Sequence, residues 1–274
     1  MPEAGPQAVE ILPETPHLGL DDRFTFRCDP GMDCFGRCCH DVSILLTPYD
    51  ALRMKRALGI DSTEFMEKYA SVMHSTDKKV PVVFLKMAPE TLKCQFVSSQ
   101  GCAIYHNRPW ACRMYPIGMA EPTGTNADAH RFFFTVKEEL CHGHGQGEER
   151  TVRDFIASQG VEPYDVAQAS FRQLLAAVAE RKEPFTAEQC AMYYMAMYDL
   201  DRFRRFVFES RFLDCFEVDE ARIEAIRTAD EELLDFAIEW RAFSLFQQRR
   251  MKLRKTAQVR QDSRSTVCAK ARQA

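Results

Sequence analysis

The chain has 274 residues, with 36 Lys and Arg against 40 Asp and Glu, so its net charge is −4. The 46% hydrophobic and 28% charged content is that of a globular protein and excludes a wholly disordered or collagen-like chain. The mild negative charge argues against nucleic-acid binding by the whole surface. No apolar run approaches the ~18 residues of a membrane span. The acidic N-terminal stretch lacks the pattern of a secretory signal, so we expect a cytoplasmic protein without membrane contact.

The sequence predicts four consecutive parts. Residues 1–20 contain four prolines and are expected to be a mostly irregular leader. Residues 21–150 form a mixed cysteine-rich domain, and residues 151–247 form a helical region. Residues 248–274 carry nine Lys and Arg against one acid, and we expect a disordered basic tail that touches nucleic acid weakly at most.

Strands and helices alternate in the cysteine-rich part. Thr47 and Pro48 are typical of a helix start, and Gly59 is typical of a helix end. Asp61 and Glu64 predict a second helix start in the same way. The expected elements are a strand over 42–46, helices over 49–58 and 61–69, a strand over 81–85, a strand pair over 92–97 and 102–105, and a strand over 131–136.

The C-terminal part has a helical pattern throughout. Residues 163–182 predict one helix, and the apolar stretch 185–216 predicts one or two buried helices. Apolar residues over 223–245 recur at steps that fit one helical face. The expected fold class is therefore α+β, with a small mixed metal-binding domain followed by a helical region that offers a surface for a protein partner.

The distribution of cysteines is unusual. Of 11 cysteines, eight fall in one segment of 114 residues. In a reducing compartment such a cluster favours metal binding over disulfides. The eight candidate metal ligands are Cys28, Cys34, Cys38, Cys39, Cys94, Cys102, Cys112 and Cys141.

The densest piece of the cluster is Cys34-Phe-Gly-Arg-Cys38-Cys39. Gly36 allows a turn with positive φ around a central atom. The adjacent Cys38 and Cys39 point in different directions, so they suit two separate centres, or one of them stays unligated. Eight cysteines make either two four-thiolate sites or one such site with a pair left for redox chemistry.

Thiolate ligands select zinc, Cu(I) or iron–sulfur clusters over magnesium, calcium and manganese. Four thiolates on Zn²⁺ or on a [4Fe–4S]²⁺ core leave a charge of −2 that needs compensation when buried. Arg37, Arg108 and Arg113 lie beside cysteines in the sequence and are suitable donors to sulfur. We expect Tyr105 next to the ligands as well, in a rigid segment that aims Cys112 inward.

Histidines adjoin two of the cysteines. His40 follows Cys39 and is an alternative ligand to a thiolate. His142 and His144 alternate with glycines after Cys141, and we favour a glycine-rich loop over metal ligation for both. No Lys-Ser/Thr pair follows, so a phosphate-binding loop is not indicated.

Three motifs of this chain resemble the YkgJ-type cysteine-cluster family, which is described as zinc- or iron-chelating. They are Cys34-x3-Cys38-Cys39 followed by Ile44-Leu-Leu-Thr47-x2-Asp50, the block Gly101-Cys-Ala-Ile-Tyr105-x2-Arg108-Pro109-x2-Cys112-Arg113-x-Tyr115-Pro116, and Cys141-His-Gly-His-Gly. The resemblance covers residues 28–147. Cys28 lies six positions before Cys34, a wider spacing than the family usually has.

The family is distantly similar to the cysteine-bearing part of flagellin lysine-N-methylases, which carry an iron–sulfur cluster. This similarity, with the non-local cysteine spacing, favours an iron–sulfur cluster of the [4Fe–4S] type over zinc. Three functions stay open: a metal-binding protein with a structural, metal-handling or redox-sensing centre, an iron–sulfur enzyme such as a lysine N-methylase, and a metal-stapled interaction module.

Overall fold

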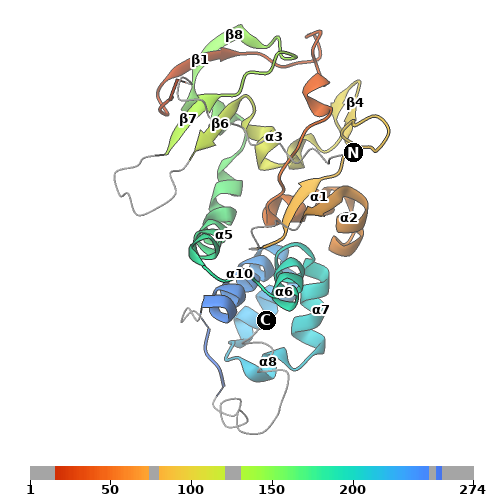
Figure 1. Ribbon diagram of the computed structural model, residues 1–274, viewed down its shortest axis with the longest axis vertical. Helices are drawn as coiled ribbons and strands as arrows, with labels where there is room; N and C mark the ends of the chain where they lie inside the picture. Colours follow the sequence, from red (N-terminus) through yellow and green to blue (C-terminus); the bar gives the residue numbers. More distant parts are fainter. Residues whose placement is uncertain (1–15, 74–79, 121–130, 247–250, 255–274) are drawn as a thin grey trace. The chain divides into compact units, whose positions relative to one another are not determined.

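The computed structural model describes residues 16–73, 80–120, 131–246 and 251–254 (Figure 1). The chain divides into two compact units. The cysteine unit comprises residues 1–45 and 85–163, and the helical unit comprises residues 46–84 and 164–274. The predicted continuous domain over 21–150 is therefore interrupted, because residues 46–84 pack with the C-terminal helices.

The cysteine unit is built from pairs of short antiparallel strands. β1 (Arg23–Phe26) pairs with β8 (His144–Thr151), β4 (Val97–Ser98) with β5 (Gly101–Cys102), and β6 (Ile117–Ala120) with β7 (Phe132–Thr135). Between them lie the 3-10 turns η1 (Arg37–Cys39) and η2 (Tyr105–Asn107) and the helices α3 (Trp110–Met114) and α4 (Val152–Ser158).

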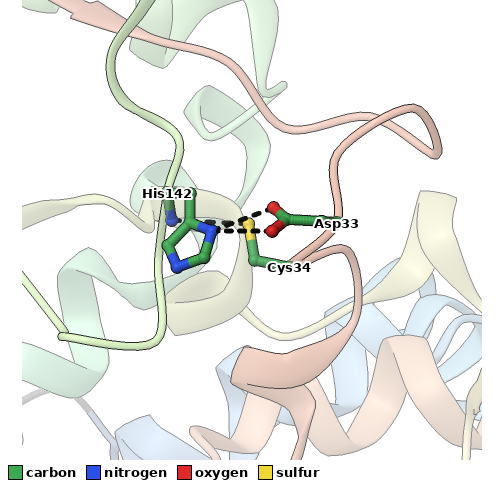
Figure 2. Close-up of side chains that lie close together, drawn as sticks. All are labelled: Asp33, Cys34 and His142. Atoms are coloured by element: carbon green, nitrogen blue, oxygen red, sulfur yellow. Dashed lines mark hydrogen bonds and ion pairs between the residues drawn. The ribbon is translucent and has the colours of Figure 1, made fainter.

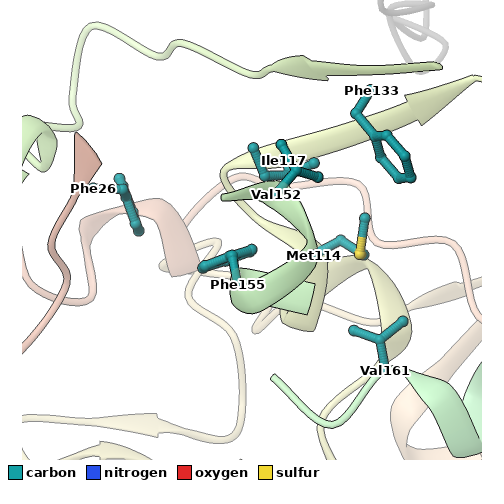
Figure 3. Packing of buried hydrophobic residues seen from close by; sticks show 7 residues of the cluster. All are labelled: Phe26, Met114, Ile117, Phe133, Val152, Phe155 and Val161. Atoms are coloured by element: carbon teal, nitrogen blue, oxygen red, sulfur yellow. The ribbon is translucent and has the colours of Figure 1, made fainter. Parts of the chain in front are cut away.

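One small apolar core holds these elements together. It contains seven buried side chains drawn from β1, α3, the β6–β7 pair, α4 and the turn after α4 (Figure 3): Phe26, Met114, Ile117, Phe133, Val152, Phe155 and Val161. Gly118 is required at one contact, because a Cβ there would lie 2.4 Å from the ring of Phe134 on the paired strand. Two-stranded sheets are only marginally stable on their own, so the apolar core and the surrounding loops stabilise this unit.

The helical unit begins with α1 (Pro48–Leu58), α2 (Ser62–Tyr69) and the strand pair β2 (Ala70–Met73) and β3 (Val82–Leu85). α5 (Glu162–Glu180) starts in the cysteine unit and continues into the helical unit. The remaining helices are α6 (Ala187–Tyr198), α7 (Leu200–Glu209), α8 (Phe212–Cys215), α9 (Glu220–Thr228) and α10 (Asp230–Phe246).

Polar contacts explain why residues 46–84 belong with the C-terminal helices. The buried Lys55 ammonium lies 2.8 Å from Asp201 and 3.0 Å from Asp230. The Ser62 and Thr63 hydroxyls donate to the buried Asp199 at 2.7 and 2.9 Å. These partners are more than 130 residues apart in the sequence, so no local pattern announces the pairing.

The predicted fold class is confirmed, and several helix boundaries are accurate. Thr47 and Asp50 form a reciprocal capping box at the start of α1, and Gly59 ends this helix at φ 66°. Asp61 caps α2 by accepting from the Glu64 backbone N–H. In contrast, residues 42–46 form no strand of their own, although Leu46 donates its N–H to Val83 of β3 at 2.8 Å.

Other elements are shorter than expected. The predicted strands over 92–97 and 102–105 reduce to the two-residue strands β4 and β5. The stretch 185–216 holds three helices rather than one or two, and the periodic stretch 223–245 is split between α9 and α10. Apolar periodicity does not register these breaks, because the cap residues Asp199, Asp219 and Ala229 fit a continuous helix pattern equally well.

The predicted leader and basic tail lie mostly outside the described residues. In the described part of the predicted leader, Leu18 pairs with Phe133 of β7. In the described part of the predicted tail, Leu253 pairs with Phe216. Across the described part of the chain, no helix has the length and apolar character needed to span a membrane.

Candidate metal centre

A series of tight turns presents the first cysteines. Arg37 donates its backbone N–H to Cys34, and Cys39 donates to Gly36, at 3.0 and 3.2 Å. Gly36 adopts φ 78°, the left-handed conformation that the sequence predicted for this loop. The chain thus reverses between Cys34 and Cys38, which brings distant thiols to one place.

A close backbone approach brings the end of the domain to this loop. The Arg27 N–H donates to the Gly143 carbonyl at 3.1 Å. A Cβ at Gly143 would lie 2.3 Å from the Arg27 carbonyl oxygen, so only glycine fits. Cys141 and His142, which precede Gly143, are thereby held beside Cys28 and Cys34, and the His142 backbone N–H donates to the Cys34 Sγ at 3.4 Å.

Four cysteines form what we call group 1: Cys28, Cys34, Cys38 and Cys141. Burial raises the pKa of Cys28 to about 11, and the charges of the other three thiolates raise it further. Electrostatic effects of one thiolate on the pKa of another are this large only when the two groups are close together. Group 1 therefore gathers the first three cysteines of the sequence cluster with its last one.

The other four cysteines form group 2: Cys39, Cys94, Cys102 and Cys112. A hydrogen bond to Cys38, burial and the charges of Cys38, Cys112 and Cys94 raise the pKa of Cys39. Burial raises the pKa of Cys102, and Cys94 adds to this rise. The backbone fixes the arrangement, because Cys94 donates its N–H to the Cys39 carbonyl at 2.8 Å and β4 pairs with β5.

Backbone amides point at the sulfur atoms of group 2. The N–H groups of Phe96 and Val97 bond to Cys94, and the N–H group of Ile104 bonds to Cys102, so each lowers the thiol's pKa against the effect of burial. Amides two and three residues after a cysteine are held there by the β4–β5 hairpin. They supply the positive dipoles that a buried thiolate centre needs.

We assign the adjacent Cys38 and Cys39 to different groups, although their thiols hydrogen-bond each other and this bond lowers the pKa of Cys38 to about 7. The two groups are therefore neighbours joined at one peptide bond.

The residues that the sequence predicted as supports of the cysteine ligands have different surroundings. Arg108 is buried, stacks 3.8 Å over the Tyr105 ring and donates to the Tyr105 carbonyl at 2.7 Å. Burial lowers the pKa of Arg108, while the thiolates of Cys112 and Cys102 act in the opposite direction, so this guanidinium lies within the field of group 2.

Arg113 has a structural role in the same segment. Its guanidinium donates to the carbonyls of His106, Arg108 and Gln159 at 2.5, 3.2 and 2.6 Å. Arg37 is exposed, and its charge is among the causes that lower the pKa of Asp33, after the hydrogen bond from His142.

Asp33, His142 and Tyr115 lie beside group 1, although the sequence did not single them out as ligands or as supports of ligands. Figure 2 shows Asp33, Cys34 and His142 facing one another, with the His142 Nδ1 at 2.9 and 3.0 Å from the two Asp33 carboxylate oxygens. The Tyr115 hydroxyl is buried without a hydrogen bond of normal geometry, and burial and the neighbouring Cys141 raise its pKa. The available signal was adjacency, since Asp33 precedes Cys34 and His142 follows Cys141.

The other two histidines differ. The ring of His144 packs against Phe26 across the β1–β8 pair. His40 is exposed, and its backbone bridges to Lys93. Gly145 and Gly147 adopt φ 72° and 86° where the β1–β8 register shifts, so they serve chain reversal, as the loop interpretation expected.

Residues 27–142 match one protein-family model. This segment is similar to the CxxCxxCC family, described as a putative zinc- or iron-chelating domain. The match spans every cysteine of groups 1 and 2 and is consistent with the YkgJ-type resemblance. Metal chelation is thus the function that the family description supports. No curated protein and no solved structure is significantly similar to the chain.

The matched segment departs from the spacing in the family's name. Cys28 and Cys34 are separated by five residues, and Cys34 and Cys38 by three. The electrostatic coupling of Cys28 to Cys34, Cys38 and Cys141 places it in group 1 in spite of the longer spacing.

Proposed function

We propose that this protein binds metal at two adjoining four-cysteine centres, group 1 and group 2, and that each centre holds an iron–sulfur cluster. The gathering of eight clustered thiols in one unit, where they act on one another's pKa values, is the observation that supports the proposal. Four cysteines are the usual ligand set of both [2Fe–2S] and [4Fe–4S] clusters. The cluster supplies electron storage or a structural anchor when bound, and the cysteines hold it.

The spacing of the thiols favours a cluster over a single ion. Four thiolates around one zinc ion at ~2.3 Å lie about 3.8 Å from each other. Among the described residues, the one group of three or more ligand atoms within 4.8 Å of one another is Asp33, Cys34 and His142, so neither cysteine group has that compact geometry. A core of several iron and sulfide atoms does not require its cysteine sulfurs to lie that close together.

Charge compensation supports both sites. Two buried centres with a charge near −2 each need positive partners. Group 2 has the amides of Phe96, Val97 and Ile104 and the guanidinium of Arg108. Group 1 has the His142 amide and the buried Tyr115 hydroxyl, which is available as a donor to sulfur. The eight clustered cysteines are free thiols, which leaves them available to a metal, whereas Cys215 of the helical unit is disulfide-bonded.

The test is anaerobic purification of the full chain, followed by quantitation of iron, zinc and acid-labile sulfide and an absorption spectrum. Two [4Fe–4S] centres predict about eight iron and eight sulfide per chain and a brown colour. Cys141→Ser and Cys94→Ser remove one ligand from group 1 and group 2, and each is expected to lower the iron content by about half. Cys190→Ser, a cysteine of the helical unit, is the matched control and keeps full iron content.

A colourless protein with zinc and without sulfide would refute the iron–sulfur proposal and leave two zinc sites. If Cys141→Ser and Cys94→Ser each abolished all bound metal, the eight thiols would form one centre instead of two.

A further inference from the structure

Asp33, Cys34 and His142 form a three-ligand cluster of mixed chemistry on the surface of the cysteine unit (Figure 2). One ligand atom of each lies within 4.8 Å of the other two. The side chains of Asp33 and His142 are 70% and 50% exposed, whereas Cys34 is buried at 8%. The cluster therefore joins solvent to one thiol of group 1.

The atoms are close to the geometry that a divalent cation requires. Tetrahedral coordination at about 2.0–2.1 Å to nitrogen and oxygen and ~2.3 Å to sulfur places N and O about 3.3 Å apart and S about 3.6 Å from each. The Asp33 carboxylate and the His142 Nδ1 are already 2.9 Å apart. A cation that replaces the proton between them needs these two atoms to move apart by only a few tenths of an ångström, and the Cys34 sulfur lies within 4.8 Å of a ligand atom of each.

The ligand types fit a transient site. Carboxylate and imidazole exchange readily with water-bound zinc or iron(II), whereas thiolates hold such ions more strongly. Glu138 acts electrostatically on Cys38, and together with Asp33 it makes the approach to group 1 acidic. Asp29 contributes less, because it is paired with Arg27 at 2.5 Å.

We propose that Asp33, Cys34 and His142 are the entry site at which a divalent cation first binds before it passes into group 1. This inference rests on the proposed function. Cys34 is the shared ligand, and it gives up its thiol proton to water when the ion first binds. The bonds from the metal to the Asp33 oxygen and the His142 nitrogen then break, and bonds to sulfurs of the other group 1 thiols form, each of which releases its proton to water. The oxidation state of the metal does not change in this step, and inorganic sulfide is the co-reactant that later completes a cluster.

The experiment follows cobalt(II) uptake by the reduced, metal-free full chain in an anaerobic stopped-flow instrument, using the cobalt–thiolate absorbance. Asp33→Asn and His142→Gln are expected to slow uptake by about tenfold or more, with the final absorbance and cobalt content unchanged. His142→Gln keeps the backbone N–H that bonds to Cys34. Asp33→Glu keeps the carboxylate and is expected to restore much of the rate.

The matched control is Asp21→Asn, which removes another exposed, ion-paired carboxylate from the same unit. It is expected to load like the wild type, and a circular dichroism spectrum confirms that each variant is folded. Wild-type uptake rates in Asp33→Asn and His142→Gln would overturn the entry site while the proposed function stands. A lower final cobalt content in these variants would also overturn it, because the two residues would then be permanent ligands. A wild-type chain that takes up no metal would overturn the proposed function itself.

Discussion

The two units of this protein are stabilised in different ways. The helical unit buries a large aromatic cluster in which Trp240 stacks on Phe203 with ring centres 5.5 Å apart and meets Phe212 edge-on at 5.4 Å. The cysteine unit has seven buried apolar residues in its main core, and the strand pairs described in it have only two strands each.

This difference indicates which unit depends on metal. A large apolar core stabilises a fold by area removed from water, at roughly 25 cal/mol per Å². A unit with a small core needs disulfides or metal to be stable. We therefore expect the helical unit to keep its stability without metal and the cysteine unit to lose much of its own.

Metal removal should produce the largest effect. Structural metal sites contribute on the order of 10 kcal/mol to folding, more than the small core supplies. A chelator under reducing conditions is expected to destabilise the cysteine unit and to leave the helical unit protected. Hydrogen exchange resolves this outcome, since amides of β1, β6 and β8 should exchange much faster than in the metal-bound protein while those of α6 and α10 stay protected. Equal loss of protection in both units would contradict the comparison.

The reciprocal change concerns the core of the helical unit. Trp240 is fully buried against Phe203 and Phe212, so Trp240→Ala leaves a cavity and is expected to cost about 3–5 kcal/mol of that unit's stability. Metal content should be unchanged because the ligands lie in the other unit. Denaturant unfolding and metal analysis on the same sample check both parts, and a parallel loss of metal would show that the units are coupled.

A smaller effect is expected from one methyl group in the cysteine unit. Gly143→Ala places a Cβ 2.3 Å from the Arg27 carbonyl and should push the Cys141 segment away from Cys28. We expect weaker metal retention by group 1 in a competition with a chelator. Gly145→Ala is the matched control, since a Cβ there meets nothing within 4 Å. Its cost is the positive φ alone, about 1 kcal/mol, and equal metal loss in both variants would argue against the close-approach explanation.

The same contrast explains what the sequence could predict. Helix boundaries such as Thr47 with Asp50 and Gly59 depend on neighbours in the chain, so α1 was accurate. The choice of eight cysteines rests on composition and spacing. The assignment of residues 46–84 to the helical unit depends on Lys55 meeting Asp201 and Asp230, and no local signal encodes such a pairing. Likewise, the pairing of Asp33 with His142 joins residues 109 positions apart.

The smallest expected effect comes from acid and again separates the two units. Burial acts to raise the pKa of Asp201, but hydrogen bonds from Lys55 and the Ser62 N–H outweigh it, so the pKa lies below its usual value in the folded state. The resulting stability is fully present above the unfolded pKa, near 3.9, and is lost as the pH falls through the folded value. Asp201→Asn should therefore reduce the slope of stability against pH below about pH 4. Urea unfolding of the helical unit between pH 2.5 and 6 measures this slope, and an unchanged slope would mean that Lys55 is balanced by Asp230 alone. Acid also removes metal from thiolates, so the measurement must follow the helical unit alone. Among the described residues, this unit contains the ion pairs of Lys55 with Asp201 and Asp230, whereas the eight clustered thiols lie in the cysteine unit.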